Sequence, residues 1–276
     1  METWATHRSR AQVLRDRYPF AGEVLGCYLA LLDVWSTLEE APSSDLVGAL
    51  DSVRRAGPRA GGRTLGAWAA SHVVPRVVAA TAAAGPDVLA KAVAEIEDPE
   101  AVLAAYLAGA ELGPVELYLA RASLYPLLAL STVEAGSPDG GTCPRCGGLP
   151  QVSVRGESGD PLVSSGRALL CSRCAYRWSF SSSTCPACGE TTGAKRTVYA
   201  EQHEGPVMSL SPAEGATTFP QLRIDACGTC QHYLIDVDLG RDPRAVPVVD
   251  ELAALPLALY ANDQGLTKIT PNLMGL

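Results

Sequence analysis

The chain has 276 residues, a formal net charge of −8 and 47% hydrophobic residues. This length and composition predict about two domains with a sizeable core. The acidic balance disfavours a general nucleic-acid ligand, because phosphate contacts need a basic surface. The N-terminal segment METWATHRSRAQVLRDRYPF has no apolar signal-peptide region, and no uncharged apolar run of about 18 residues predicts membrane insertion. Nine cysteines without a secretion signal then indicate a cytoplasmic protein whose cysteines serve metal or redox chemistry.

Residues 1–135 are dominated by alanine and leucine, which predicts six or seven helices packed as a bundle. Proline and glycine signals separate them, including Gly57-Pro58, Asp98-Pro99 and Gly113-Pro114. The segment GPRAGGR reads as a flexible connection, and Pro75 as a kink or a break.

Composition changes after Glu134, where AGSPDGGT reads as a polar linker. Alternating segments beyond it predict short strands in QVSVRG, GRALLC, YRWSFSS, KRTVYAEQ, LRID and YLIDVDLG, with another near residues 206–210. One helix of about fifteen residues is expected within VPVVDELAALPLALYAND, before an extended tail. The predicted fold class is α+β, with a helical bundle (1–135), a first rubredoxin-like or zinc-ribbon module (136–182) and a second with the C-terminal helix and tail (183–276).

Eight of the nine cysteines form four C-x-x-C pairs, and this pattern is the strongest signal in the chain. Two cysteines separated by two residues can place both sulfurs on one metal ion when the turn between them is tight. Two such turns complete a tetrahedral site of four sulfurs, so four pairs predict two metal sites. The predicted ligands are Cys143, Cys146, Cys171, Cys174, Cys185, Cys188, Cys227 and Cys230.

Sequential pairing of the turns is favoured, since each strand hairpin then lies between its own two turns. Crossed pairing stays open, because only ten residues separate the second turn from the third. Four protein ligands leave no position for water, so we expect no catalytic residue and no enzyme activity. Each ion could simply hold a small module together. Iron and zinc both suit four sulfurs.

The remaining candidates have plainer interpretations. Cys27 lies in the apolar run VLGCYLALL and is expected to be a buried core thiol. His232 could orient the sulfur of Cys230, but an ordinary strand residue is expected. His7 and His72 have no metal-ligand partner nearby in sequence, and His203 lies within the cysteine region.

Charge is uneven along the cysteine region. Residues 141–200 hold seven Lys/Arg against three Asp/Glu, whereas residues 201–276 hold four against ten. The basic excess is expected to offset thiolate charge. Two alternatives stay open: the basic part could dock an acidic partner, and the acidic part could receive a basic peptide.

The cysteine region resembles the FdhE family of formate dehydrogenase accessory proteins over about residues 143–276. The resemblance rests on CPRCGGLPQVSV, GRALLCSRCAYRW, TCPAC, DACGTCQHYLIDVDLGRDPRAVPVVDELAALPLAL and the tail ITPNLMGL. The loop SLSPAEGATTFP departs from the family pattern.

This resemblance implies a cytoplasmic assembly factor that binds the catalytic subunit of a respiratory, molybdenum-containing formate dehydrogenase before its export by the twin-arginine pathway. It also implies iron in rubredoxin-like sites at the eight cysteines. Two other classes stay open. One is an electron carrier or thiol–disulfide redox protein that uses the C-x-x-C pairs directly; the other is a nucleic-acid-binding ribbon protein.

Overall fold

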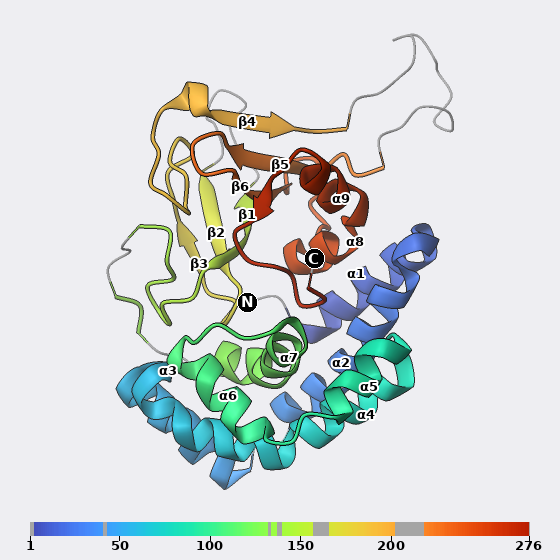
Figure 1. Ribbon diagram of the computed structural model, residues 1–276, viewed down its shortest axis with the longest axis vertical. Coiled ribbons are helices and arrows are strands. Elements are labelled where there is room, and N and C mark those ends of the chain that lie inside the picture. Colours follow the sequence, from blue (N-terminus) through green and yellow to red (C-terminus); the bar gives the residue numbers. More distant parts are fainter. Residues whose placement is uncertain are drawn as a thin grey trace.

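The computed structural model describes residues 3–40, 43–131, 134–136, 140–156, 166–201 and 218–275. Figure 1 shows two layers, with the helices of the N-terminal half below and a mixed sheet above them. The predicted strand near residues 206–210, most of the loop SLSPAEGATTFP and His203 lie outside the described residues. The expected α+β fold class is confirmed.

In the described part of the chain, seven helices make up the lower layer, within the six or seven that the sequence predicts. Ser43 accepts a hydrogen bond from the backbone N–H of Leu46 and so caps the third helix, as Asp98 caps the sixth through Ala101. The bounds are α1 (Trp4–Arg17), α2 (Gly22–Glu40), α3 (Ser44–His72), α4 (Val74–Ala84), α5 (Asp87–Ala94), α6 (Pro99–Ala108) and α7 (Pro114–Leu130).

The predicted flexible connection GPRAGGR is wrong, because this segment continues as part of α3. Gly57 interrupts the helix with φ 73° and ψ 166°, a conformation that glycine adopts without steric cost, and Pro58 restarts it. Gly62 then brings α3 close to α6, since an added Cβ would lie 3.1 Å from Leu107. The expected break at Pro75 is confirmed, with α3 ending at His72 and α4 beginning at Val74.

Helix α2 is both apolar and internal. The segment Pro19–Glu39 has a mean hydropathy of 1.2 and would be long enough to cross a membrane, against the expectation from sequence. Core helices of globular proteins pass the same test of length and composition, and 56% of its most apolar 18-residue stretch is buried within the protein. Figure 1 places α2 among the other helices, where Leu25, Leu31 and Leu32 are fully buried.

The strands of both cysteine modules form one sheet, a union that the sequence did not predict. The order is β3-β2-β1-β6-β5-β4, with β7 paired to β6. The bounds are β1 (Pro150–Arg155), β2 (Arg167–Cys171), β3 (Arg177–Ser179), β4 (Arg196–Tyr199), β5 (Leu222–Cys227), β6 (His232–Asp238) and β7 (Thr267–Lys268). The hairpin strands β1–β2–β3 and β4–β5–β6 are antiparallel, and the short β7 pairs with β6 in parallel. The modules are joined by parallel pairing of β1 with β6, Val152 opposite Ile235. The predicted domain boundaries near residues 135 and 182 stay predictions.

A buried carboxylate reinforces the junction of the two modules. Asp236 on β6 accepts hydrogen bonds from Ser153 and Arg155 on β1, at 2.5 and 2.8 Å, and from Arg223 on β5 at 2.8 Å. Its side chain is fully buried. These bonds hold the pKa of Asp236 below its usual value even though burial acts in the opposite direction.

The C-terminal helix expected as one piece is two, α8 (Pro247–Ala253) and α9 (Leu255–Asp263). The chain leaves helical geometry at Ala254, with ψ 30°, just before Pro256, whose ring disfavours helix at the preceding positions. Helix α8 is completely buried and lies between the sheet and the helices α1 and α2. Buried Asp250 of α8 pairs with Arg10 of α1, which also bonds Asp242 at 2.8 Å. The two layers are therefore joined by charge as well as by apolar packing.

Candidate metal centres

The structure brings the eight cysteines together in two groups of four, paired sequentially along the chain. Site 1 is Cys143, Cys146, Cys171 and Cys174, and site 2 is Cys185, Cys188, Cys227 and Cys230. Within each group all sulfur atoms lie within 4.8 Å of one another. Sequential pairing follows from the hairpins, since β1–β2 connects the two turns of site 1 and β4–β5 lies between the turns of site 2.

The sulfur separations fit a tetrahedral metal ion. A metal–sulfur bond of about 2.3 Å places the sulfurs of a regular tetrahedron about 3.8 Å apart. In site 1 the Sγ atoms of Cys143 and Cys174 are 3.7 Å apart, and in site 2 those of Cys185 and Cys230 are 3.8 Å apart. The other diagonal pairs are at 3.4 Å in site 1 and 3.8 Å in site 2. Both donor sets therefore fit a tetrahedral metal ion held by four thiolates.

The same backbone turn recurs at all four C-x-x-C pairs. The residue after each second cysteine has a positive φ: 70° at Gly147, 54° at Ala175, 78° at Gly189 and 58° at Gln231. At Gly147, Gly189 and Gln231 the backbone N–H donates to the carbonyl of the first cysteine of its pair, at 2.8 to 2.9 Å. The left-handed residue closes the turn, which is why both sulfurs of a pair face the same point. Glycine adopts this conformation freely, whereas Ala175 and Gln231 adopt it at a steric cost.

Site 1 is enclosed by protein. Each of its four cysteines is at most 8% exposed. The neighbouring Gly148 admits no side chain, because an added Cβ would lie 2.8 Å from Arg173 and 3.0 Å from the sulfur of Cys171. The backbone N–H of Arg173 also lies 3.3 Å from that sulfur, as a donor to it. These contacts shape the pocket around the sulfurs before any ion is considered.

Arg173 ties site 1 to the helical layer. It lies between the two cysteines of the second turn, and its guanidinium donates to the carbonyls of Tyr106 at 2.7 Å and Leu107 at 3.3 Å. These carbonyls belong to the last turn of α6, where the helix dipole favours a cation. The guanidinium also lies 4.7 Å from the centre of the Tyr106 ring. A change in the turn at site 1 would therefore be felt by α6.

Site 2 is open to solvent on one side. Cys185 and Cys227 are buried, but Cys188 is exposed and Cys230 is partly exposed. Glu190 links the two turns of this site, since it accepts hydrogen bonds from the backbone of Thr192 and from the hydroxyl of Thr229, both at 2.8 Å. These bonds lower the pKa of Glu190 to about 2, the backbone bond most of all. Site 2 can therefore exchange a ligand or an electron with the solution more readily than site 1.

Each group contains a thiol that ionises readily without metal. In site 1, hydrogen bonds from Cys146 and the two other thiols lower the pKa of Cys143, whereas burial raises the pKa of Cys171. In site 2, burial opposes ionisation of Cys227, but the backbone N–H groups of Cys230 and Thr229 prevail and lower its pKa to about 7. A thiolate is the form that binds metal, so Cys143 and Cys227 are the thiols best prepared to bind an ion.

The remaining sequence candidates lie where their plainer interpretations put them. Cys27 is fully buried, with its sulfur 3.5 Å from the hydroxyl of Tyr118. His232 lies in β6, and its Nδ1 is 2.8 Å from the carbonyl oxygen of Cys230, so it orients the turn backbone rather than a sulfur. His7 is buried beside Tyr28 and His72 stacks on Trp68, both in the helical layer. Sequence reasoning did not find Arg173 or Asp236, whose roles depend on partners far away in the chain.

The fold and its two sites define a class of protein in which a helical layer supports a single sheet carrying two four-cysteine, rubredoxin-like groups. Both groups lie at the turns of the sheet, and each brings four cysteine sulfurs together. The family model for the FdhE C-terminal domain matches residues 184–274, which include all of site 2. The resemblance to the FdhE family indicated by the sequence is confirmed.

Curated relatives match this chain over longer stretches than the family model does. An FdhE homologue from Aquifex aeolicus is 28% identical over 133 residues, or 48% of this chain, and one from Pseudomonas aeruginosa is 32% identical over 133 residues, also 48%. These matches span 41% and 38% of the two relatives, about two fifths of their length. A homologue from Stutzerimonas stutzeri is 27% identical over 260 residues, which cover 93% of this chain and 70% of the relative.

The architecture as a whole has a solved counterpart. The crystal structure of the FdhE protein from Pseudomonas aeruginosa superimposes with a TM-score of 0.70 and 21% identity, covering 98% of this chain and 95% of that one. The helical layer, which carries no recognisable motif, is thus part of the shared fold.

Proposed function

We propose that this protein is a non-enzymatic accessory factor for a respiratory formate dehydrogenase, and that it binds the catalytic subunit in the cytoplasm before export. The observation that carries this proposal is the pair of four-cysteine groups on one sheet, in a chain that resembles the FdhE family. Closed sites of four sulfurs suit structural, sensing or electron-carrying roles rather than hydrolysis.

We further propose that the eight cysteines bind two metal ions, one at each site. The geometry does not distinguish iron from zinc, because four sulfurs in a tetrahedron suit both ions. The family resemblance favours iron. A bound ion would cross-link the two turns of its site, whose relative position is otherwise fixed only by the hairpin between them. If the ion is iron, the charge of the site would change by one when ferrous iron is oxidised to ferric iron. Metal analysis of the purified protein should find two ions per chain, and a visible sulfur-to-iron absorption would identify iron.

The test of the accessory role is affinity co-purification from the native host grown with formate dehydrogenase expressed. The expected result is recovery of the dehydrogenase catalytic subunit, identified by mass spectrometry. Cys143→Ser and Cys185→Ser each disable one site, and Cys27→Ala is the matched control, since Cys27 lies outside both groups. If the control and the wild type alike recover no dehydrogenase subunit from metal-loaded protein, the proposed function is wrong.

The exposure of site 2 favours a second candidate, a rubredoxin-like electron carrier. Exposed Cys188 would bring a bound iron close to a redox partner at the surface. A reversible one-electron couple with fast electron exchange, without recovery of the dehydrogenase subunit, would support this candidate over the first. The same couple together with recovery of the subunit would instead describe a redox-sensitive accessory factor.

A further inference from the structure

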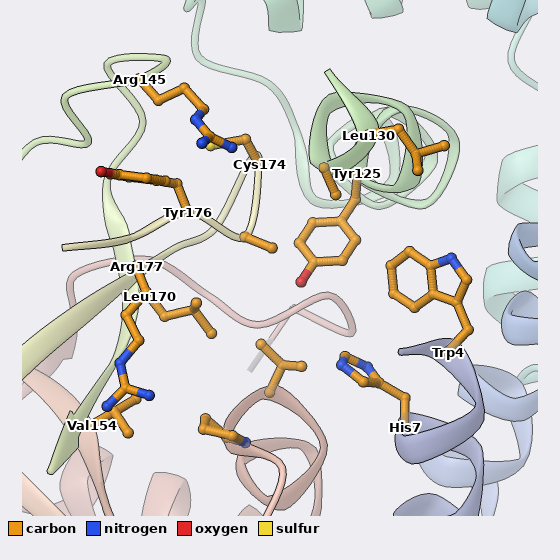
Figure 2. A pocket seen from close by; sticks show the side chains of 14 residues that line it. Trp4, His7, Tyr125, Leu130, Arg145, Val154, Leu170, Cys174, Tyr176 and Arg177 are labelled. Atoms are coloured by element: carbon orange, nitrogen blue, oxygen red, sulfur yellow. The ribbon is translucent and has the colours of Figure 1, made fainter. Parts of the chain in front are cut away.

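A cavity of about 800 Å³ lies between the helical layer and the first cysteine module. This volume is in the range of ligand-binding clefts, about 300–1,000 Å³. Figure 2 shows its opposite walls: Trp4 and His7 of α1 on one side, Arg145, Tyr176 and Arg177 of the cysteine module on the other, with Tyr125 of α7 between them. Chain segments far apart in sequence thus build one site, which is partly open to solvent.

The cavity has cationic groups and no acidic counterpart. Arg145 and Arg177 line it, and no Asp or Glu is among the described residues that do. Neither guanidinium forms a hydrogen bond or ion pair with another described side chain. The Nε atom of Arg145 is buried without a hydrogen-bond partner, and its guanidinium stacks on Tyr176 with 4.3 Å to the ring centre. Stacking holds this cation in place, which favours recognition of a carboxylate.

The rest of the lining is aromatic and apolar. Trp4, Tyr125, Leu170 and Val248 contribute to it, and the hydroxyl of Tyr125 is directed into the space in Figure 2. A ligand that satisfies both kinds of wall carries a carboxylate beside an aromatic or aliphatic side chain. Short acidic peptide segments have this composition, and a basic cavity suits them by charge.

We propose that this cavity binds a short acidic peptide segment, with acidic side chains at Arg145 and Arg177 and an apolar side chain between Trp4 and Leu170. The proposal deepens the proposed function, on which it rests for the expectation that the ligand belongs to a protein partner. It also gives a location to the basic excess of residues 141–200.

Site 1 and the cavity share a wall. Arg145 lies between Cys143 and Cys146, and the turn of Cys174, Ala175 and Tyr176 lines the cavity directly. Loss of the site 1 cross-link would let both cavity-forming turns move, whereas the residues of site 2 do not line the cavity. Peptide binding should therefore depend on Cys143 and be insensitive to Cys185.

The test is fluorescence anisotropy of the metal-loaded, full-length protein with two labelled pentapeptide pools. Both pools contain one aromatic residue; one carries two Asp or Glu residues and the other carries Asn or Gln at the same positions. The acidic pool should bind, and the neutral pool about tenfold or more weakly, because each charge-assisted hydrogen bond contributes roughly a factor of ten. The double variant Arg145→Gln/Arg177→Gln should bind the acidic pool about tenfold or more weakly than the wild type does. Arg63→Gln/Lys195→Gln removes the same charge from two exposed side chains and should not.

Several other results would decide between this proposal and its alternatives. Equal binding of the acidic pool by wild type and Arg145→Gln/Arg177→Gln, or no binding at all, would show that the cavity is not the site. Binding of 3-phenylpropionate without binding of the acidic pool would assign it to a small carboxylic acid. Recovery of the dehydrogenase subunit by Arg145→Gln/Arg177→Gln at wild-type level would leave the proposed function standing and remove this proposal. Binding of the acidic pool by wild-type protein that recovers no dehydrogenase subunit would leave the peptide site standing and remove the proposed function.

Discussion

Asp236→Asn should weaken the junction between the two cysteine modules and lower the unfolding free energy of the protein. Asp236 is the fully buried carboxylate of β6 that joins β1 and β5, through Ser153, Arg155 and Arg223. Asparagine has one acceptor oxygen where aspartate has two, and it carries no charge. At least one arginine then loses its partner while its side chain stays only 23% to 25% exposed.

The expected loss is about 3 kcal/mol of unfolding free energy. Removing one partner of a buried ion pair costs about 3–5 kcal/mol, and the lower end applies because both arginines retain some contact with water. Asp238→Asn is the matched control. Asp238 is 22% exposed and its closest guanidinium contact is at 3.6 Å, so its loss should cost less than about 1 kcal/mol.

The assay is urea unfolding of the metal-loaded protein, together with amide hydrogen exchange resolved to β1 and β6. Faster exchange in both strands is expected for Asp236→Asn, because the parallel pair is the only backbone link between the modules in the described sheet. If Asp236→Asn and Asp238→Asn lower stability by the same amount, the carboxylate does not hold the junction.

The contribution of Asp236 to the unfolding free energy should decrease at acid pH. Because the pKa of Asp236 is lower in the folded protein than its unfolded value, its contribution is fully present above pH about 4 and is lost as the pH falls through the folded pKa. Asp236→Asn should abolish this part of the acid dependence. An unchanged acid profile would contradict the assignment.

The other predictions concern the two sites. A chelator should remove metal from site 2 before site 1, because Cys188 is exposed while every site 1 cysteine is buried. The measurement is the metal content of the protein over time, and simultaneous release from both sites would contradict the prediction. Arg173→Ala should lower stability by about 2–4 kcal/mol, through the lost bonds to α6 and the unpaired carbonyls that remain, with Arg63→Ala as the exposed control in thermal unfolding. Gly148→Ala should destabilise by about 1–3 kcal/mol and speed metal loss from site 1, since its Cβ has no room beside Cys171; Gly156→Ala, where an added Cβ meets nothing within 4 Å, should change neither.

Local sequence patterns were sufficient to predict many of the helix and strand positions. The helix start at Asp98-Pro99, the break at Pro75 and the strands beside the cysteine turns were predicted because each depends on a few neighbouring residues. The errors were of two kinds. GPRAGGR was predicted as a loop because its glycines suggest flexibility, but α3 continues there because packing against α6 accommodates them. The C-terminal helix was predicted as one, although Pro256 divides it.

The pairing of cysteine sulfurs within each turn could be derived from the sequence alone, because a C-x-x-C turn places two sulfurs together through local backbone geometry. Tertiary structure decided everything that needs distant segments: the parallel pairing of β1 with β6, the burial of site 1 against α6 and the exposure of Cys188. It also brought Trp4 to the same cavity as Arg145 and Arg177. Contacts between residues more than about sixty positions apart leave no periodic trace in the sequence, since neither partner's neighbours reveal the other.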